Sequence, residues 1–143
     1  MGDLAELGGL ESAQRGLRPV QVMHLPCKIH HDGAADVEAY FRPTETDKKS
    51  GTIVDEKGDM AQIREATFRG RKLLGAELTL PEKTQGFVLE KEDGTAPGEP
   101  EHWECQAVFD RIVYWNFDRV PSEVDETRRW ADWLEVSRAI NLA

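Results

Sequence analysis

Residues 74–80 carry the pattern that most constrains the fold, a strict alternation of apolar side chains with small or polar ones. The apolar set is Leu74, Ala76, Leu78 and Leu80, and the positions between them are Gly75, Glu77 and Thr79. Successive side chains of a β-strand point to opposite faces of a sheet, so the alternation predicts a strand with one buried face. Pro81 ends this strand because it has no amide hydrogen to donate to a ladder.

Other runs of β-branched and aromatic residues predict further short strands around this one. They are a bent strand over 20–31 interrupted by Pro26, a short apolar run at 37–41 closed by Pro43, and strands at 63–68, 86–90 and 103–117, the last divided at Asp110-Arg111. A C-terminal amphipathic helix is predicted to begin between Ser122 and Ala131. Its apolar stripe consists of Trp130, Trp133, Leu134, Ser137 and Ile140.

The rest of the chain is predicted to be irregular. We expect a disordered tail at 1–18, then a single domain at 19–143 with flexible loops near 44–62 and 91–102, where charged residues, Gly and Pro dominate. Five or six strands and one helix make a mainly β fold. We expect a small antiparallel β-barrel that shares strands with a partner subunit, because closure and strand sharing both remove exposed edges.

Composition argues against several classes of function. The 143 residues include 18 basic and 27 acidic side chains, and the net charge of −9 repels a polyphosphate unless basic residues gather on one face. Two cysteines are too few for a disulfide framework, which favours an intracellular protein. The N-terminus has neither a basic start nor a long apolar run, so we expect no signal peptide and no membrane span.

Two Cys/His pairs, Cys27 with His30 and His102 with Cys105, have the donor types of a zinc site. Residues three apart on a strand point to opposite faces, so neither pair converges without a tight turn. Buried cysteines and exposed histidines are the favoured interpretation, and we expect no metal and no cofactor.

Evidence for a catalytic centre of the chain's own is weak. Nine of the 27 carboxylates lie in the two expected loops and the others are spread along the chain, whereas a two-metal hydrolase needs several of them converging from rigid elements. The sequence has no Gly-rich phosphate loop, nucleophile elbow or His-Glu-x-x-His pattern. We therefore expect a protein that is not an enzyme.

The basic run Phe68-Arg69-Gly70-Arg71-Lys72 has two interpretations. An aromatic residue beside cations suits a nucleic-acid backbone. Three cations in an acidic chain are better explained by bridges to acidic groups of the fold or of a partner, although contact of Arg69, Arg71 or Lys72 with a substrate backbone stays open. Trp130 and Trp133 are interpreted as core or interface anchors.

Three segments, taken in order, resemble a known family. They are His24-Leu25-Pro26-Cys27-Lys28-Ile29 with Asp32-Gly33 and 37–43, then Thr67-Phe68-Arg69-Gly70-Arg71-Lys72-Leu73-Leu74-Gly75 running through Leu80-Pro81 to Gly86-Phe87-Val88, and finally Tyr114-Trp115-Asn116 with Pro121 and 133–140. Together they resemble the non-catalytic C subunit of eukaryotic ribonuclease H2 over residues 20–143. The N-terminus and the two acidic loops do not match.

The resemblance implies a nuclear heterotrimer in which the catalytic A subunit holds the two-metal site, while the B and C subunits interweave strands into a joint barrel. The assembly hydrolyses RNA in RNA/DNA hybrids and cuts at single ribonucleotides in DNA, with roles in DNA replication and genome stability. This chain would stabilise the B subunit, would support the catalytic subunit, and would meet the hybrid only through the complex. No catalytic residues are expected in it.

Within that expectation, three groups of residues are assigned to the fold and the partner interface. Leu74, Ala76, Leu78 and Leu80 form the barrel face, and 68–71 fixes a strand junction. The C-terminal segment meets the catalytic subunit through Trp115, Trp133 and Ile140. The predicted interface therefore consists of Phe68, Arg69, Gly70, Arg71, Leu74, Leu78, Trp115, Trp133 and Ile140. The alternatives are a free-standing β-barrel module that binds nucleic acid or peptide, and a metal-dependent hydrolase.

Overall fold

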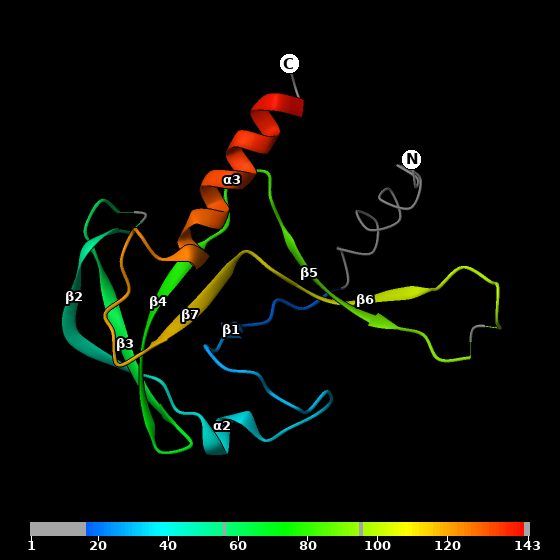
Figure 1. Cartoon of the computed structure of the whole chain (residues 1–143), viewed down its shortest axis with the longest axis horizontal. Coiled ribbons are helices and arrows are strands. Elements are labelled where there is room, and N and C mark those ends of the chain that lie inside the picture. The colour runs from blue at the N-terminus through cyan, green and yellow to red at the C-terminus, as the bar shows by residue number, and fades with distance from the viewer. Residues whose placement is uncertain (1–16, 56, 95, 142–143) are drawn as a thin grey trace.

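The computed structural model describes residues 17–141 except residues 56 and 95. Its main element is a five-stranded sheet in the order β1-β7-β4-β3-β2, beside a separate two-stranded ribbon of β5 and β6 (Figure 1). The strands are β1 (Val22–His24), β2 (Thr44–Val54), β3 (Met60–Phe68), β4 (Arg71–Thr79), β5 (Gly86–Lys91), β6 (Trp103–Phe109) and β7 (Arg111–Phe117). The helices are α2 (Val37–Tyr40) and α3 (Glu126–Asn141).

Strand β4 forms the centre of the sheet, at the position where the alternation predicted a strand with one buried face. It pairs antiparallel with β3 on one side and with β7 on the other. Leu74, Ala76 and Leu78 are buried on one face, and Leu73 is buried on the opposite face. Leu80, which the alternation placed on the same face, lies just beyond the strand and is only partly buried. The sheet therefore has an apolar cluster on each face.

The first cluster lies beneath α3. It joins β2, β3, β4 and β7 through Ile53, Ala61, Ile63, Leu74, Ala76, Leu78 and Tyr114, and Ala131 of α3 packs against it. Seven side chains from four strands make this a core rather than a pairwise contact. No residue of α3 itself is buried. The helix therefore rests on the core by its first turns.

The second cluster lies on the other face and is aromatic. Phe41, which follows α2, packs edge-on against Trp115 with ring centroids 5.2 Å apart. Gly75 lies opposite Trp115 in the β4–β7 register, and a Cβ there would come within 2.6 Å of the indole. The glycine is therefore required by the ring that covers it, since a methyl group would force Trp115 out of place.

The predicted barrel is not formed by the described residues. The five-stranded sheet is open, with β1 at one edge and β2 at the other. Strand β1 extends only over Val22–His24, so the predicted strand at 20–31 is mostly irregular. Pro26 explains this, because a proline stops the ladder soon after it begins.

Two further predictions from sequence were wrong. The segment 44–62 was assigned to a loop, yet β2 spans Thr44–Val54 and β3 begins at Met60. Strand β2 is a polar edge strand whose side chains mostly face solvent while its backbone pairs with β3 across two register shifts. Residues 37–41 form one helical turn rather than a strand, with Phe41 N–H donating to Val37 O at 2.7 Å. Polarity alone does not separate an edge strand from a loop.

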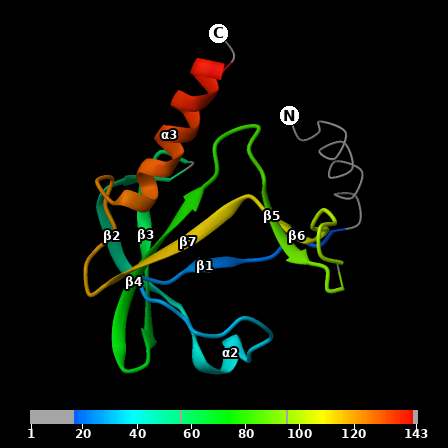
Figure 2. The ribbon, with the colours of Figure 1, turned by 45° about the vertical axis from the view of Figure 1, so that its right-hand side comes forward.

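Other predicted elements are confirmed. Strands lie at 86–91, 103–109 and 111–117, a loop separates β5 from β6, and α3 begins inside the predicted window. The ribbon and α3 both project away from the five-stranded sheet, as the turned view shows (Figure 2). Of the predicted tail at 1–18, residues 1–16 lie outside the described residues.

Candidate partner interface

The residues considered for metal chemistry do not assemble in the described part of the chain. No group of three or more His, Cys, Asp and Glu side chains there is placed to hold a metal ion. Cys27 is exposed and Cys105 is partly buried, with its thiol 3.7 Å from the Ala107 carbonyl.

The helices of the described part of the chain lack the length and the apolar character that a membrane span requires.

The predicted strand junction at 68–71 is a tight hairpin turn between β3 and β4. Phe68 and Arg71 lie opposite each other, and the two residues between them have positive φ, 51° at Arg69 and 78° at Gly70. Two consecutive positive φ values are typical of the turn that joins twisted antiparallel strands. The glycine suits the second position because it carries no Cβ penalty there.

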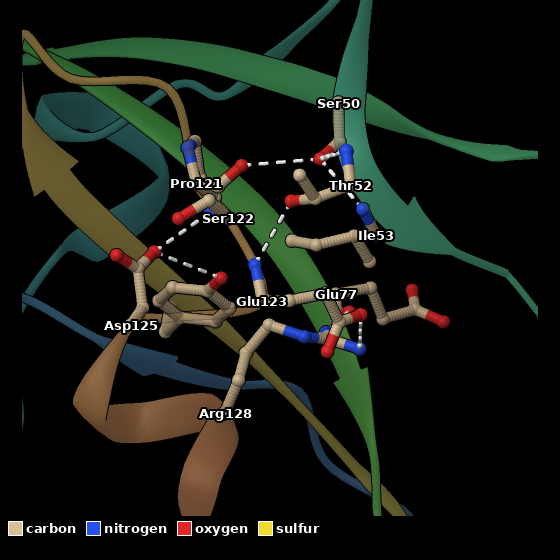
Figure 3. A network of polar contacts seen from close by, with 10 residues as sticks. Ser50, Thr52, Ile53, Glu77, Pro121, Ser122, Glu123, Asp125 and Arg128 are labelled. Atoms are coloured by element: carbon tan, nitrogen blue, oxygen red, sulfur yellow. Dashed lines mark hydrogen bonds and ion pairs between the residues drawn. The ribbon is translucent and has the colours of Figure 1, made fainter.

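The base of α3 is fixed to the sheet by a buried carboxylate, which is not among the residues singled out from the sequence. Asp125 is 7% exposed and accepts four hydrogen bonds, two of which are drawn in Figure 3. Tyr114 Oη and Asn116 Nδ2 donate from β7 at 3.1 and 3.0 Å. Ser122 N–H donates at 2.9 Å and the Arg119 guanidinium at 3.2 Å. The Ser-x-x-Asp spacing, which resembles a capping box, is the sequence signal that could have pointed to it.

Burial has an electrostatic consequence for Tyr114. Removal of its phenol from water, with the Asp125 carboxylate beside it, raises the pKa of Tyr114 above its usual value. The phenol therefore stays protonated and acts as a donor. A donor of this kind suits a buried carboxylate, which would otherwise be costly.

The same segment is also bonded to β2 and β4. Ser50, 2% exposed, donates through Oγ to the Pro121 carbonyl at 3.1 Å, and Glu123 N–H donates to Thr52 Oγ1 at 3.0 Å (Figure 3). Arg128 donates to the Glu77 carbonyl at 3.3 Å. These contacts join residues more than fifty positions apart, so the start of α3 has one orientation.

Beyond its base, α3 presents its apolar stripe to solvent. Trp133 and Ile140 are 66% and 70% exposed. Trp130, Leu134 and Val136 are 44–48% exposed, with Trp130 5.7 Å from the His24 ring. Near the C-terminus, Arg138 donates to the Glu82 carbonyl at 2.7 Å, so the helix is held at both ends while the stripe stays uncovered. Apolar side chains therefore remain exposed along α3 in the folded chain.

The β5–β6 ribbon is a second surface of this kind. Val88, Leu89 and Trp103 are 39%, 47% and 55% exposed, although all three lie in paired strands. The end of the ribbon nearer the sheet is tied down by Val108, which exchanges backbone hydrogen bonds with Arg18 and Val20. A two-stranded ribbon with apolar side chains on both faces gains little stability by itself in water.

The residues assigned from sequence to the partner interface therefore occupy different environments. Trp133 and Ile140 are exposed on α3, and the hairpin residues 69–71 are exposed at the end of the sheet farthest from α3 (Figure 1). Leu74, Leu78 and Trp115 are buried in the chain's own core. The exposed ribbon residues were not among those chosen, because alternation alone does not say which strand face is covered.

Comparisons with known proteins identify relatives along nearly the whole chain. A family model described as "Ribonuclease H2 non-catalytic subunit (Ylr154p-like)" matches residues 21–102 and 90–140. An uncharacterized protein of Schizosaccharomyces pombe is 31% identical over 125 residues, covering 81% of this chain and 79% of that protein. The C subunit of ribonuclease H2 from Mus musculus is 26% identical over 151 aligned positions, covering 89% of this chain and 84% of the mouse protein.

Proposed function

The chain belongs to the ribonuclease H2 non-catalytic subunit family, and from this we propose that it is the structural C subunit of a heterotrimer with a catalytic A subunit and with a B subunit. The family is that of a non-catalytic subunit, so this chain is not itself the enzyme. We further propose that the complex hydrolyses RNA in RNA/DNA hybrids, excises single ribonucleotides from DNA, and acts in the nucleus during replication and genome maintenance. The chain stabilises the B subunit, and it supports the catalytic one.

One observation carries this proposal: apolar side chains stay exposed on elements that are otherwise well formed. The ribbon has paired backbones but uncovered Val88, Leu89 and Trp103. Strands from the B subunit that pair along the ribbon or along the edge strand β2 would complete a joint barrel and bury these side chains. The same pairing would satisfy edge amides and carbonyls that the chain leaves unpaired.

The outer stripe of α3 supports a second contact, which we assign to the catalytic subunit. Trp133 and Ile140 are large, apolar and exposed, and the helix base that presents them is rigid. Aromatic residues on a rigid element are the usual anchors of a protein interface. The ribbon and the helix project from the sheet separately, so two partners can be bound at once (Figure 2).

Co-expression tests this role. The chain produced alone is expected to be poorly soluble, and co-expression with the A and B subunits from the same genome should recover a stable trimer at one-to-one-to-one stoichiometry. Size-exclusion chromatography with light scattering gives the composition. A chain that stays folded, monomeric and apart from both of them would instead indicate a free-standing binding module.

A further inference from the structure

The hairpin between β3 and β4 carries the basic run of the sequence, and its two arginines have no carboxylate partner in the described structure. Neither the Arg69 side chain nor the Arg71 side chain forms an ion pair or hydrogen bond with any described residue. Lys72 differs, because its ammonium lies 3.6 Å from Glu65 on the neighbouring strand. The fold therefore supplies no carboxylate to either guanidinium, and both exposed groups stay available to a partner or to a nucleic-acid backbone.

Both guanidinium groups are nevertheless positioned. The Arg69 Cζ lies 5.1 Å from the centre of the Phe68 ring, and the Arg71 Cζ lies 4.9 Å from that of Phe117. Phe68 itself packs edge-on against the buried Phe41, with centroids 6.2 Å apart. A guanidinium held over a ring loses less side-chain entropy on binding and keeps its N–H edges directed outward.

The charge of the chain decides which ligand suits this site. The net charge of −9 disfavours the approach of a polyphosphate, whose charge extends over many ångströms. A few carboxylates on a protein surface do not meet that repulsion to the same degree, and the planar fork of Arg binds a carboxylate by two parallel hydrogen bonds. The site therefore favours acidic side chains over a nucleic-acid backbone.

We propose that Arg69 and Arg71 of the β3–β4 hairpin form a receptor for acidic side chains of a partner subunit. The hairpin lies at the end of the sheet opposite α3, so this contact is separate from the helix stripe (Figure 1). The inference rests on the proposed function, because it requires an assembled complex, and adds to it the chemistry of one contact. The partner segment would place two carboxylates near the hairpin.

A charge-reversal pair tests this site in the assembled trimer. Arg69→Glu with Arg71→Glu is expected to weaken association of the chain at least about tenfold at 0.1 M salt and to flatten the salt dependence of the Kd. The control is Lys28→Glu with Lys57→Glu, which changes the charge equally at exposed positions outside β2, the ribbon and α3 that form no ion pair among described residues. That control should change the Kd less than about threefold.

A conservative pair separates charge from geometry. Arg69→Lys with Arg71→Lys keeps both charges but loses the planar fork, so its Kd should fall between those of the wild type and the reversal. If the charge reversal lowers the thermal midpoint of the trimer, the Kd of the lysine pair still separates a lost contact from a destabilised fold. Equal Kd values for wild type, reversal and lysine variants would overturn the proposal.

Nucleic acid is the competing ligand, and its outcome is distinct. If the reversal leaves assembly unchanged but weakens binding of an RNA/DNA hybrid duplex by the purified trimer, the arginines contact phosphate and the proposal is wrong. The wild-type chain is the reference for the proposed function. Failure of the wild type to join the A and B subunits would contradict that function, whereas failure of the variants to weaken assembly contradicts only the hairpin site.

Discussion

The central strands and the ribbon strands have similar lengths but opposite environments. Strand β4 buries five of its nine residues, whereas the last four residues of β5 are all exposed. Strand β4 is paired on both sides, whereas β5 pairs only with β6 among the described residues and keeps one open backbone edge. The sheet has its own cover, from α3 on one face and from Phe41, Met23 and Leu25 on the other. The part of the ribbon that carries Val88, Leu89 and Trp103 has no such cover among the described residues.

Removal of the Asp125 carboxylate beneath α3 should destabilise the covered five-stranded sheet, and this is the largest effect that we expect. Asp125→Ala leaves Tyr114 Oη and Asn116 Nδ2 buried without an acceptor, and is expected to lower the free energy of unfolding by about 3–5 kcal/mol. Thermal unfolding of the purified trimer gives the loss, and hydrogen exchange should rise first in 50–53 and in α3. Asp125→Asn keeps one acceptor oxygen and should lose less.

Truncation of an exposed apolar side chain should weaken assembly and leave the fold intact. Trp133→Ala removes an exposed indole, so the chain should keep its stability while its affinity for the catalytic subunit falls by about 2–3 kcal/mol. Competition binding against the wild-type chain measures this. The matched control is Tyr40→Ala, which removes an exposed aromatic side chain from α2 instead of α3. An unchanged Kd for Trp133→Ala would remove α3 from the interface.

Alkaline pH should destabilise the covered sheet less than substitution of Asp125 does. The pKa of Tyr114 is raised in the folded state, so the folded protein holds a proton that the unfolded chain releases near about pH 10. Stability should be level between about pH 7 and about pH 9 and fall above about pH 10. The Tyr114→Phe variant should lack the part of this loss of stability that comes from the Tyr114 hydroxyl. Denaturant titrations at each pH give the free energy of unfolding. If this free energy falls equally steeply with pH in both proteins, the role given to Tyr114 is contradicted.

Much of the five-stranded sheet could be predicted from sequence because its signals are local. The alternation at 74–80 identified the buried face of β4, and the basic run with Gly70 identified the turn before it. The network of Asp125 was missed because its donors on β7 come together only after folding. Strand β2 was missed because an edge strand with polar side chains has no apolar alternation to detect.

The interface could be predicted only in part, for a related reason. Helical spacing identified Trp133 and Ile140 as one stripe, but it does not say whether the stripe faces the chain's own core or a partner. Leu74, Leu78 and Trp115 have equally strong patterns and are buried inside the folded chain. Exposure in the folded chain separates the two groups, and on that ground we add the ribbon residues Leu89 and Trp103 to the proposed interface.

Cleavage of an RNA/DNA hybrid by complexes with and without this chain tests the account most directly. The A and B subunits are co-expressed with the wild-type chain or without it, and initial rates are compared at equal concentration of the catalytic subunit. We expect the complex without the chain to be unstable and at least about a hundredfold less active, with activity restored when the chain is co-expressed. Full activity and a stable two-subunit complex in its absence would contradict a structural role.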